Sequence, residues 1–434
     1  MNKIKFENIF NILFPIIVPI ILVYFYNFQV QPKYEYMGYP KVESFSFFKF
    51  FISIVFLYLS SMNLVKVIEK PSHILMYITY LFVICPTISL MSIVIDMEVI
   101  EYLLNMIVIY FSFLIICLIS KSDVNISIYK EIDKRLYIWL FFIFLFFSIS
   151  CVIYFYGFNI SKIFSLSSVG ELYDIRNEFR NDNSSVPSVV QYLFFWNIKV
   201  LVPFLFLFGL LIKNKKLILI SLFLQFVLFS VSGQKSIFLG LIFVYCFWVL
   251  LNRYPDKSGF YLKLSFFILL LTSLILILGG QDVLLDIIVR RMIIIPGVLT
   301  SLYFDFFSQN DFSKFGYSIF KGLFDYNYDF SPPFVIGSYY FSRSDLSANA
   351  NFIASAYGEF GYISCIIFSL LVSVIYKVID SCLLDKNNIR KLCTVGAVLP
   401  TWALADSALL TTLITHGLFA FFILIIFIPR FNEH

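Results

Sequence analysis

Leu136-Tyr-Ile-Trp-Leu-Phe-Phe-Ile-Phe-Leu-Phe-Phe-Ser-Ile-Ser-Cys-Val-Ile-Tyr-Phe-Tyr156 contains no charged side chain. A helix needs about 20 apolar residues to cross the hydrocarbon core of a bilayer, and this run supplies them. Comparable runs recur along the whole chain, which has 434 residues, of which 60% are hydrophobic and only 14% are charged. The sequence therefore predicts an all-α polytopic membrane protein.

About twelve such segments predict a single integral membrane domain over residues 1–434. The expected transmembrane helices cover residues 8–26, 46–64, 73–95, 99–120, 136–156, 192–212, 217–233, 236–252, 260–279, 355–379, 392–411 and 413–430. Between the last two, Thr411 to Gly417 leaves almost no room for a turn, so a re-entrant pair is the alternative there.

The positions of lysine and arginine predict which loops face the cytoplasm, because short cytoplasmic loops are enriched in both. With the N-terminus inside, the inward segments carry Lys3, Lys5, Lys66, Lys70, Lys121, Lys130, Lys134, Arg135, Lys213, Lys215, Lys216, Arg253, Lys257, Lys263, Lys386, Arg390 and Lys391. The short outward loop at 96–101 carries only acidic charges. Both termini are therefore expected in the cytoplasm. Two long loops, residues 157–191 and 280–350, are expected on the outer side.

The first long loop contains two arginines on one expected helix face. Residues 171–182 read Glu-Leu-Tyr-Asp-Ile-Arg-Asn-Glu-Phe-Arg-Asn-Asp, and Gly170 and Pro187 bound a short predicted helix. Arg176 and Arg180 are four residues apart and share one face of it. Two guanidinium groups on one face suit a pyrophosphate. The alternative is a solvated surface helix whose charges pair with one another.

The second long loop opens with an apolar run that contains twin arginines, Arg290 and Arg291. Charges inside lipid are costly, so residues 283–304 are expected to form a helix in the outer interface or a broken span. The arginines then contact either a bound anion or only the lipid phosphates.

The remainder of the second loop is dense in phenylalanine and tyrosine, with carboxylates and amides between them. This segment extends from Tyr303 to Phe341 and includes Asp305. Aromatic faces interleaved with polar groups suit sugar rings. An aromatic belt at the membrane surface is the alternative, and both can hold.

Other polar residues are expected near the outer side of the membrane. Lys235 lies in the turn Ser232-Gly-Gln-Lys-Ser236 and either adds a positive charge to the same site or is an ordinary loop lysine. Glu359 is either a general base or a salt-bridge partner of the arginines. Asn349 and Asn351 precede it and are candidate substrate ligands.

Three polar residues, Lys199, Asp406 and His416, fall inside expected spans. Such residues usually face a cavity. Lys199 and Asp406 can instead form a structural pair, and a histidine with satisfied hydrogen bonds is more common than a catalytic one.

Motifs for nucleotide or metal chemistry are not found. The sequence has no Walker A motif, no HExxH and no glycine-rich dinucleotide motif, and no His, Cys and Asp cluster has metal-ligand spacing. The seven cysteines lie in or beside apolar segments and read as core residues. No metal, cofactor or nucleic acid is therefore expected, and an enzyme here would use an activated, lipid-linked substrate.

Taken together, the chain resembles the Wzy-type O-antigen polymerases, which join oligosaccharide repeat units. The resemblance rests on the architecture of about twelve spans with two outward loops that carry arginines. Locally it rests on Glu171-Leu-Tyr-Asp-Ile-Arg-Asn-Glu-Phe-Arg180, Ser232-Gly-Gln-Lys-Ser236, Arg290-Arg291 with Pro296-Gly297, and Asn349-Ala-Asn351 with Ala356-Tyr-Gly-Glu-Phe-Gly361.

The resemblance implies a metal-independent, membrane-embedded glycosyltransferase of the C type in the bacterial inner membrane, with its active site facing the periplasm. It would transfer a growing glycan from undecaprenyl pyrophosphate to the terminal sugar of a new lipid-linked repeat unit. Membrane lipids and a chain-length regulator are the other implied partners. The implied catalytic residues are Arg290, Arg291, Glu359 and, second to Glu359, Asp305. The implied substrate-binding residues are Arg176, Arg180, Lys235, Tyr303, Asn349 and Asn351.

Three other functions fit a polytopic membrane protein. A flippase for lipid-linked repeat units would have shorter outward loops and charges lining a central cavity. An O-antigen ligase would use the same donor with a different acceptor. A generic transporter is the third, although the spans show no obvious internal repeat.

Overall fold

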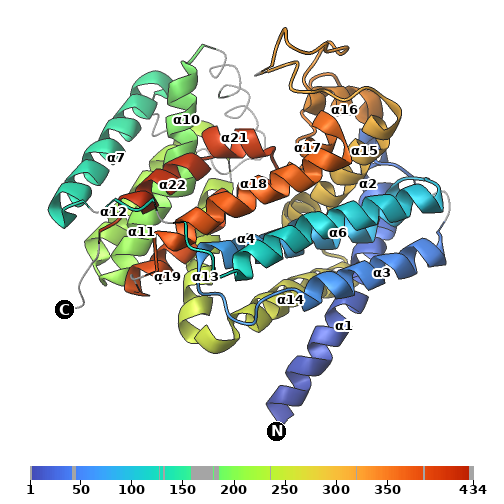
Figure 1. The fold of residues 1–434 in the computed structure, drawn as a ribbon, viewed down its shortest axis with the longest axis horizontal. Helices are drawn as coiled ribbons and strands as arrows, with labels where there is room; N and C mark the ends of the chain where they lie inside the picture. Colours follow the sequence, from blue (N-terminus) through green and yellow to red (C-terminus); the bar gives the residue numbers. More distant parts are fainter. Residues whose placement is uncertain are drawn as a thin grey trace.

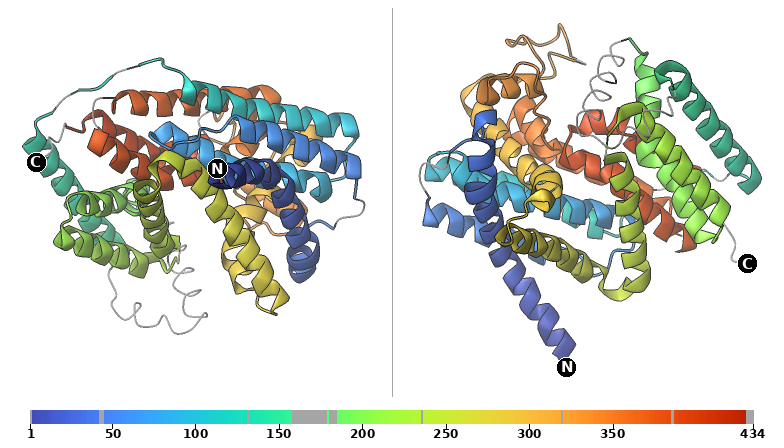
Figure 2. Two further views of the ribbon diagram at one scale, coloured as in Figure 1. Left: turned by 90° about the horizontal axis from the view of Figure 1, so that it is seen from below. Right: turned by 180° about the vertical axis from the view of Figure 1, so that it is seen from behind.

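The computed structural model describes residues 2–41, 45–126, 128–130, 132–157, 179, 185–234, 236–318, 320–384 and 387–429 (Figure 1). Helices make up 78% of the structure, and no β-strand is formed among these residues. The N-terminal helix projects beyond the rest of the molecule, and the view from behind shows the same projection (Figure 2).

Most helices follow one another closely along the described chain, and the longest described connection lies between α15 and α16. The N-terminal half contains α1 (Asn2–Phe25), η1 (Tyr26–Val30), α2 (Gln31–Tyr34), η2 (Glu35–Met37), α3 (Phe47–Met62), α4 (Pro71–Thr79), η3 (Tyr80–Ile84), α5 (Cys85–Val94), α6 (Val99–Lys121), α7 (Lys134–Tyr156), α10 (Ser188–Trp196), η5 (Asn197–Leu201) and α11 (Val202–Leu211). The C-terminal half contains α12 (Lys215–Ser232), α13 (Ser236–Arg253), η6 (Pro255–Lys257), α14 (Ser258–Leu278), η7 (Leu285–Ile294), α15 (Ile295–Gln309), α16 (Pro332–Phe341), α17 (Phe352–Phe360), α18 (Tyr362–Ser381), α19 (Asn387–Gly396), α20 (Val398–Trp402), η8 (Ala403–Ala405), α21 (Leu409–Ile414) and α22 (Leu418–Ile426).

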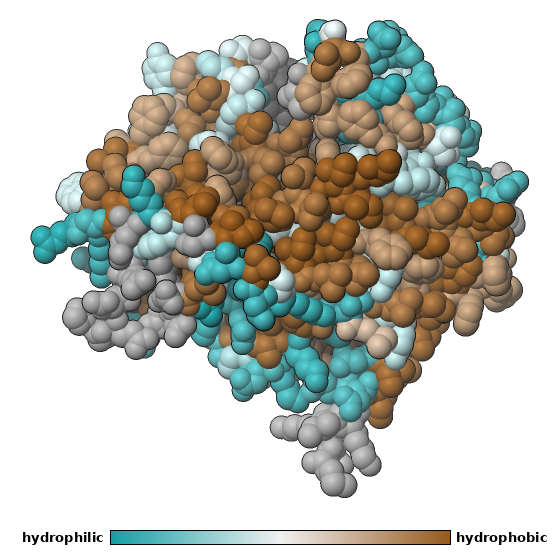
Figure 3. Space-filling view, in the orientation of Figure 1, coloured by the Kyte–Doolittle hydropathy of each residue, from teal (hydrophilic) through white to brown (hydrophobic). Residues whose placement is uncertain are grey.

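Ten helices among the described residues are long and apolar enough to cross a membrane. They are Phe6–Met37, Pro71–Val94, Val99–Lys121, Lys134–Tyr156, Ser188–Leu211, Lys215–Ser232, Ser236–Arg253, Pro255–Leu278, Leu285–Gln309 and Tyr362–Ser381. A broad hydrophobic band crosses one face of the molecule, with hydrophilic residues gathered at the upper right and along the lower edge (Figure 3). The prediction of an all-α polytopic membrane protein is confirmed at this level.

The structure differs from the expected twelve spans at three places. Helix α3 has only 16 residues. The expected span 355–379 is divided at Gly361, whose φ of +71° lies in the left-handed region. The last two expected spans form the short helices α19 to α22, with a second left-handed glycine at Gly417. A turn at residues 415–417 joins α21 to α22, and the re-entrant arrangement of this pair stays a prediction.

The second long loop is not irregular throughout, because its first part is one continuous helix. Segments η7 and α15 join into a 25-residue helix, Leu285–Gln309, which is apolar enough to span a membrane. Residues 283–304 were expected to lie in the interface or to form a broken span. The helix is unbroken but contains a wide turn. The side of the membrane on which residues 310–350 lie stays a prediction.

Wide π-helical turns precede four prolines in the described helices. Segments η1, η3, η5 and η7 each end two residues before a proline, at Pro32, Pro86, Pro203 and Pro296 respectively. Proline has no N–H and its ring crowds the carbonyl of residue i−4. The preceding carbonyls therefore bond to residue i+5, which widens the helix locally. Pro15 and Pro19 lie inside α1 without such a turn.

The centre of the molecule is the helix Pro71–Val94, whose apolar segment is entirely buried. Helices α1, α3 and α15 pack against its α5 part. Gly297 permits the approach of α15, because a Cβ added there would lie 2.7 Å from the backbone of Pro86. This contact fixes the helix that carries Arg290 and Arg291 against the centre of the protein.

The aromatic-rich connection between α15 and α16, residues 310–331, is here called the aromatic loop. It is anchored by Glu359, which is only 4% exposed. Its carboxylate accepts hydrogen bonds from the Ser313 hydroxyl at 2.6 Å, the Phe315 N–H at 2.7 Å and the Tyr317 hydroxyl at 3.0 Å. Burial raises the pKa of the Glu359 carboxyl, and the three donors oppose this rise. Glu359 therefore fastens the start of the loop to the end of α17.

Replacing Glu359 with alanine should destabilise the protein by about 2–4 kcal/mol, because three donors lose their shared acceptor in a buried place. Thermal unfolding of the purified full chain in detergent measures this loss. Asp329→Ala is the matched control, since Asp329 is an exposed acid of the same loop. Equal midpoints for the two variants would contradict the anchoring role.

Candidate functional site

A cavity of about 600 Å³ lies between the start of η7, the start of α13, η5 and the C-terminal segment around η8. Its apolar lining includes Phe195, Ile237, Phe243 and Trp402. The polar and charged side chains that line it are Lys199, Gln234, Ser236, Asp286, Arg290, Arg291, Asn349, Asp406 and His416. A cavity with apolar walls and a few convergent polar groups is the usual form of a ligand site.

The twin arginines reach the cavity from the π-helical segment η7. In an ordinary α-helix, consecutive side chains diverge strongly around the axis. The wider π turn has more residues per turn, so Arg290 and Arg291 point in more similar directions. Both line the same cavity, Arg290 half-buried and Arg291 exposed. Pro296 causes this geometry, because η7 ends just before it.

Arg290 is positioned by two tyrosines, Tyr34 at the end of α2 and Tyr39 just after η2. Its guanidinium carbon lies 4.1 Å from the centre of the Tyr34 ring, which is a close cation–π contact. Arg290 also lies beside Tyr39, where its positive charge opposes the burial that raises the pKa of the Tyr39 hydroxyl. Among the described residues, the buried Arg290 Nε has no hydrogen-bond partner. No carboxylate of the described chain therefore takes up the charge of this arginine.

Lys33 forms an ion pair with Asp286, the acid that would otherwise pair with Arg290. Asp286 precedes Arg290 by four residues, which is the spacing of a helical ion pair. Instead, Lys33 binds the Asp286 carboxylate and also lies 2.5 Å from the Asp282 carboxylate. Lys33 holds the pKa of Asp282 below its ordinary value. This bridge leaves the charge of Arg290 to the cavity.

The opposite wall carries Lys199, Asp406 and His416. Lys199 lies in η5, the π turn before Pro203, and it interacts electrostatically with Asp406. Asp406 follows η8 and is exposed to the cavity, although Ala405 and Ser407 beside it are buried. The His416 and Phe195 rings pack at right angles, with centroids 5.4 Å apart, and the buried His416 Nδ1 has no hydrogen-bond partner within the described part of the chain.

Basic side chains outnumber acidic ones around this cavity. Arg290, Arg291 and Lys199 face two carboxylates, Asp286 and Asp406, and Lys33 already neutralises Asp286. The excess positive charge favours an anionic ligand, and the guanidinium groups suit phosphate oxygens. Among the described residues, no three His, Cys, Asp or Glu side chains gather as metal ligands.

The structure brings together only part of the predicted site. Arg290, Arg291 and Asn349 line the cavity, as do the three intramembrane residues Lys199, Asp406 and His416. Arg176, Arg180 and Lys235 lie outside the described residues.

Four other predicted site residues lie in the protein interior or bind neighbouring groups. Tyr303 is buried and its hydroxyl donates to the Ala348 carbonyl at 3.2 Å. Asp305 accepts a hydrogen bond from Tyr340. Asn351 is buried and caps α17 through the Ile353 and Ala354 N–H groups. Glu359 was expected beside the arginines, but its carboxylate is taken up by the aromatic loop.

Lys33 and Tyr34 were missed by the sequence analysis. Both lie at the end of the first membrane helix, about 250 residues from the arginines that they serve. A lysine and a tyrosine at the end of an apolar helix look like ordinary interface residues. Only the acid pair Asp282 and Asp286, spaced for one helix face, could have indicated that a basic partner was needed.

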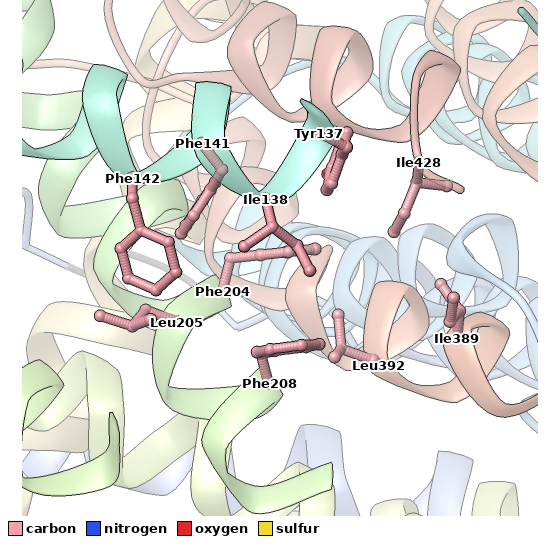
Figure 4. Close-up of a pocket in the computed structure, with 10 residues that line it drawn as sticks. All are labelled: Tyr137, Ile138, Phe141, Phe142, Phe204, Leu205, Phe208, Ile389, Leu392 and Ile428. Carbon is pink, nitrogen blue, oxygen red and sulfur yellow. The ribbon is translucent and has the colours of Figure 1, made fainter. Parts of the chain in front are cut away.

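A second hollow lies between α7, α11 and the C-terminal end and is almost wholly apolar. It has a volume of about 20 Å³ and is lined by residues such as Phe141, Phe204 and Ile428 (Figure 4). Its one polar side chain, Tyr137, donates a hydrogen bond to the Leu424 carbonyl at 3.1 Å. This hollow offers no group for chemistry, so the charged cavity is the candidate site.

Comparison with known proteins gave no match: no family model fits the chain, and no curated protein or solved structure is significantly similar to it. Function is therefore inferred from the cavity itself.

Proposed function

We propose that the chain is a membrane-embedded glycosyltransferase that polymerises lipid-linked oligosaccharide repeat units. It transfers the growing glycan from undecaprenyl pyrophosphate to the terminal sugar of a new repeat unit. The observation that carries this proposal is the cavity where Arg290, Arg291 and Lys199 converge within an otherwise apolar protein. Such a cavity suits a substrate that joins a pyrophosphate to a hydrocarbon tail.

The proposed reaction needs positive charge at the leaving group. The acceptor hydroxyl oxygen forms a bond to the anomeric carbon as the bond from this carbon to the pyrophosphate oxygen breaks. The electron pair stays on the pyrophosphate, whose charge increases in the transition state. Preorganised guanidinium groups stabilise that charge, especially where water is largely excluded. Arg290 and Arg291 are assigned this role, with Lys199 on the facing wall.

The acceptor hydroxyl also needs a base for its proton. Asp406 is the candidate, because its carboxylate lines the cavity, where Lys199 is its electrostatic partner. It replaces Glu359, the first choice from sequence, whose carboxylate is engaged by three donors of the aromatic loop. A base must be within reach of the reacting group, and geometry takes precedence over residue type.

The polysaccharide profile of a deletion strain complemented with single variants tests the proposal. Arg290→Ala should retain single repeat units but lose long chains, because loss of one charge-stabilising donor costs about 10²–10³ in rate. Arg343→Ala is the matched control, since this exposed arginine pairs with Asp345 at 2.8 Å, away from the cavity lining. Normal long chains from Arg290→Ala at equal membrane levels would overturn the proposal. Loss of every repeat unit would indicate a flippase or a ligase instead.

The two carboxylates can be distinguished by amide substitution. Asp406→Asn should abolish chain extension, because the amide cannot accept the acceptor's proton. Glu359→Gln should keep measurable extension per molecule in the membrane, since Glu359 serves to hold the loop. The same polysaccharide profile, normalised to membrane protein, gives the comparison. Full extension by Asp406→Asn would remove Asp406 from the reaction.

Lys33→Met should reduce chain extension by about an order of magnitude, because Asp286 becomes free to pair with Arg290. Adding Asp286→Asn to this variant removes the competing charge and should restore most of the loss. Extension is measured as the chain-length distribution. A double variant as impaired as Lys33→Met alone would contradict the idea that Lys33 keeps Arg290 available.

A further inference from the structure

A separate open groove lies at the other end of the helices from the twin arginines. It has a volume of about 720 Å³ and lies between the ends of α11 and α13, the loop before α12, and the start of α19. Figure 1 places these four helices together at the left of the molecule. The groove is lined by Leu210, Leu211, Lys213, Tyr245, Trp248, Val249, Asn252, Arg253 and Lys391.

Three positive charges from three separate segments converge on this groove. Lys213 comes from the α11–α12 loop, Arg253 from the end of α13 and Lys391 from α19. Its lining contains no acidic side chain among the described residues. Lysines and arginines that serve only to set the orientation in the membrane can be scattered over the inner loops. Convergence on one hollow is what an anion-binding site requires.

The local structure holds these charges in place. The Lys391 ammonium donates a hydrogen bond to the Asn252 side-chain oxygen at 3.0 Å, and the Asn252 amide donates to the Trp248 carbonyl at 2.8 Å. Lys213 has a φ of +55°, a left-handed conformation that lysine rarely adopts. Glycine or asparagine usually occupies such a position after a helix. At this position the chain places a charged residue in a strained backbone conformation.

The groove also presents apolar surface beside the charges. Tyr245 is 47% exposed and Val249 is 39% exposed, and Leu210 and Leu211 complete that side. An aromatic and aliphatic wall next to basic residues matches a lipid, whose phosphate meets the charges while its chains lie along the helices. A free phosphate ion would use only the charged half. Basic pockets between membrane helices are known sites for anionic headgroups.

We propose that this groove binds an anionic phospholipid, with the phosphodiester held by Lys213, Arg253 and Lys391 and the acyl chains against Tyr245 and Val249. This site is independent of the pyrophosphate cavity and of the proposed transferase function. Phosphatidylglycerol is the probe, and phosphatidylcholine is the neutral comparison.

Native mass spectrometry of the purified full chain, with either lipid added in detergent, measures retention. The double variant Arg253→Gln/Lys391→Gln should bind phosphatidylglycerol about 25-fold more weakly, at roughly fivefold per charge. Lys215→Gln/Lys216→Gln removes two charges from the neighbouring first turn of α12, outside the lining, and should bind as the natural chain does. If both double variants lost the same amount of phosphatidylglycerol binding, general surface charge and not the groove would account for it, and the proposal would be overturned.

Two further arms complete the test. Inorganic phosphate at low millimolar concentration should leave phosphatidylglycerol bound; complete displacement would assign the groove to free phosphate and overturn the lipid assignment. If the double variant does not fold, Arg253→Gln alone carries the comparison. The Arg253 guanidinium lies 5.8 Å from the Tyr254 ring centre and makes no hydrogen bond within the described chain. A single variant that binds phosphatidylglycerol as tightly as the natural chain would equally overturn the proposal.

Discussion

Proline within an apolar helix is the constraint on which this structure depends. An apolar helix in lipid must satisfy its backbone internally, because no water is present to do so. Each of four prolines removes one donor, and a wide turn restores the bonding upstream. Two of these turns, η5 and η7, carry Lys199 and the twin arginines. The same local defect that the backbone must accommodate therefore also directs positive charge into the interior.

Charge in such an interior persists only if it is compensated. Arg290 lies over the Tyr34 ring, and Asp286 is neutralised by Lys33 rather than by Arg290. A direct Asp286–Arg290 pair would give similar electrostatic compensation but would leave little attraction for an anion. The observed arrangement instead separates the acid from the arginine through a third residue. The Lys33–Asp286 pair thus compensates the buried acid, while the contact of Arg290 with the Tyr34 ring leaves the arginine charge able to attract an anion.

The sequence contained most of the information about helices and little about which side chains meet. Apolar runs predicted the long helices well, because burial in lipid and helix length are local properties. Arg290 and Arg291 were predicted as site residues because a charge in an apolar run is conspicuous, and both line the cavity. Glu359 was misplaced for the opposite reason: its partners Ser313 and Tyr317 come from a loop without periodic pattern. Pro203 and Pro296, which follow η5 and η7, were visible in the sequence, and the wide turns before them could have been inferred.

The distribution of the cavity walls along the chain has a consequence for biogenesis. Lys199 comes first along the chain, Arg290 and Arg291 follow, and Asp406 and His416 come last. A ribosome that synthesises the chain from its N-terminus therefore completes the segments with Lys199 and the arginines long before the segment with Asp406 and His416. Until residues 398–416 are in place, the wall that faces the arginines is incomplete. Packing of this segment is therefore the step at which the site is first assembled, and a nascent chain stalled before it would leave the charges of Arg290 and Arg291 unenclosed.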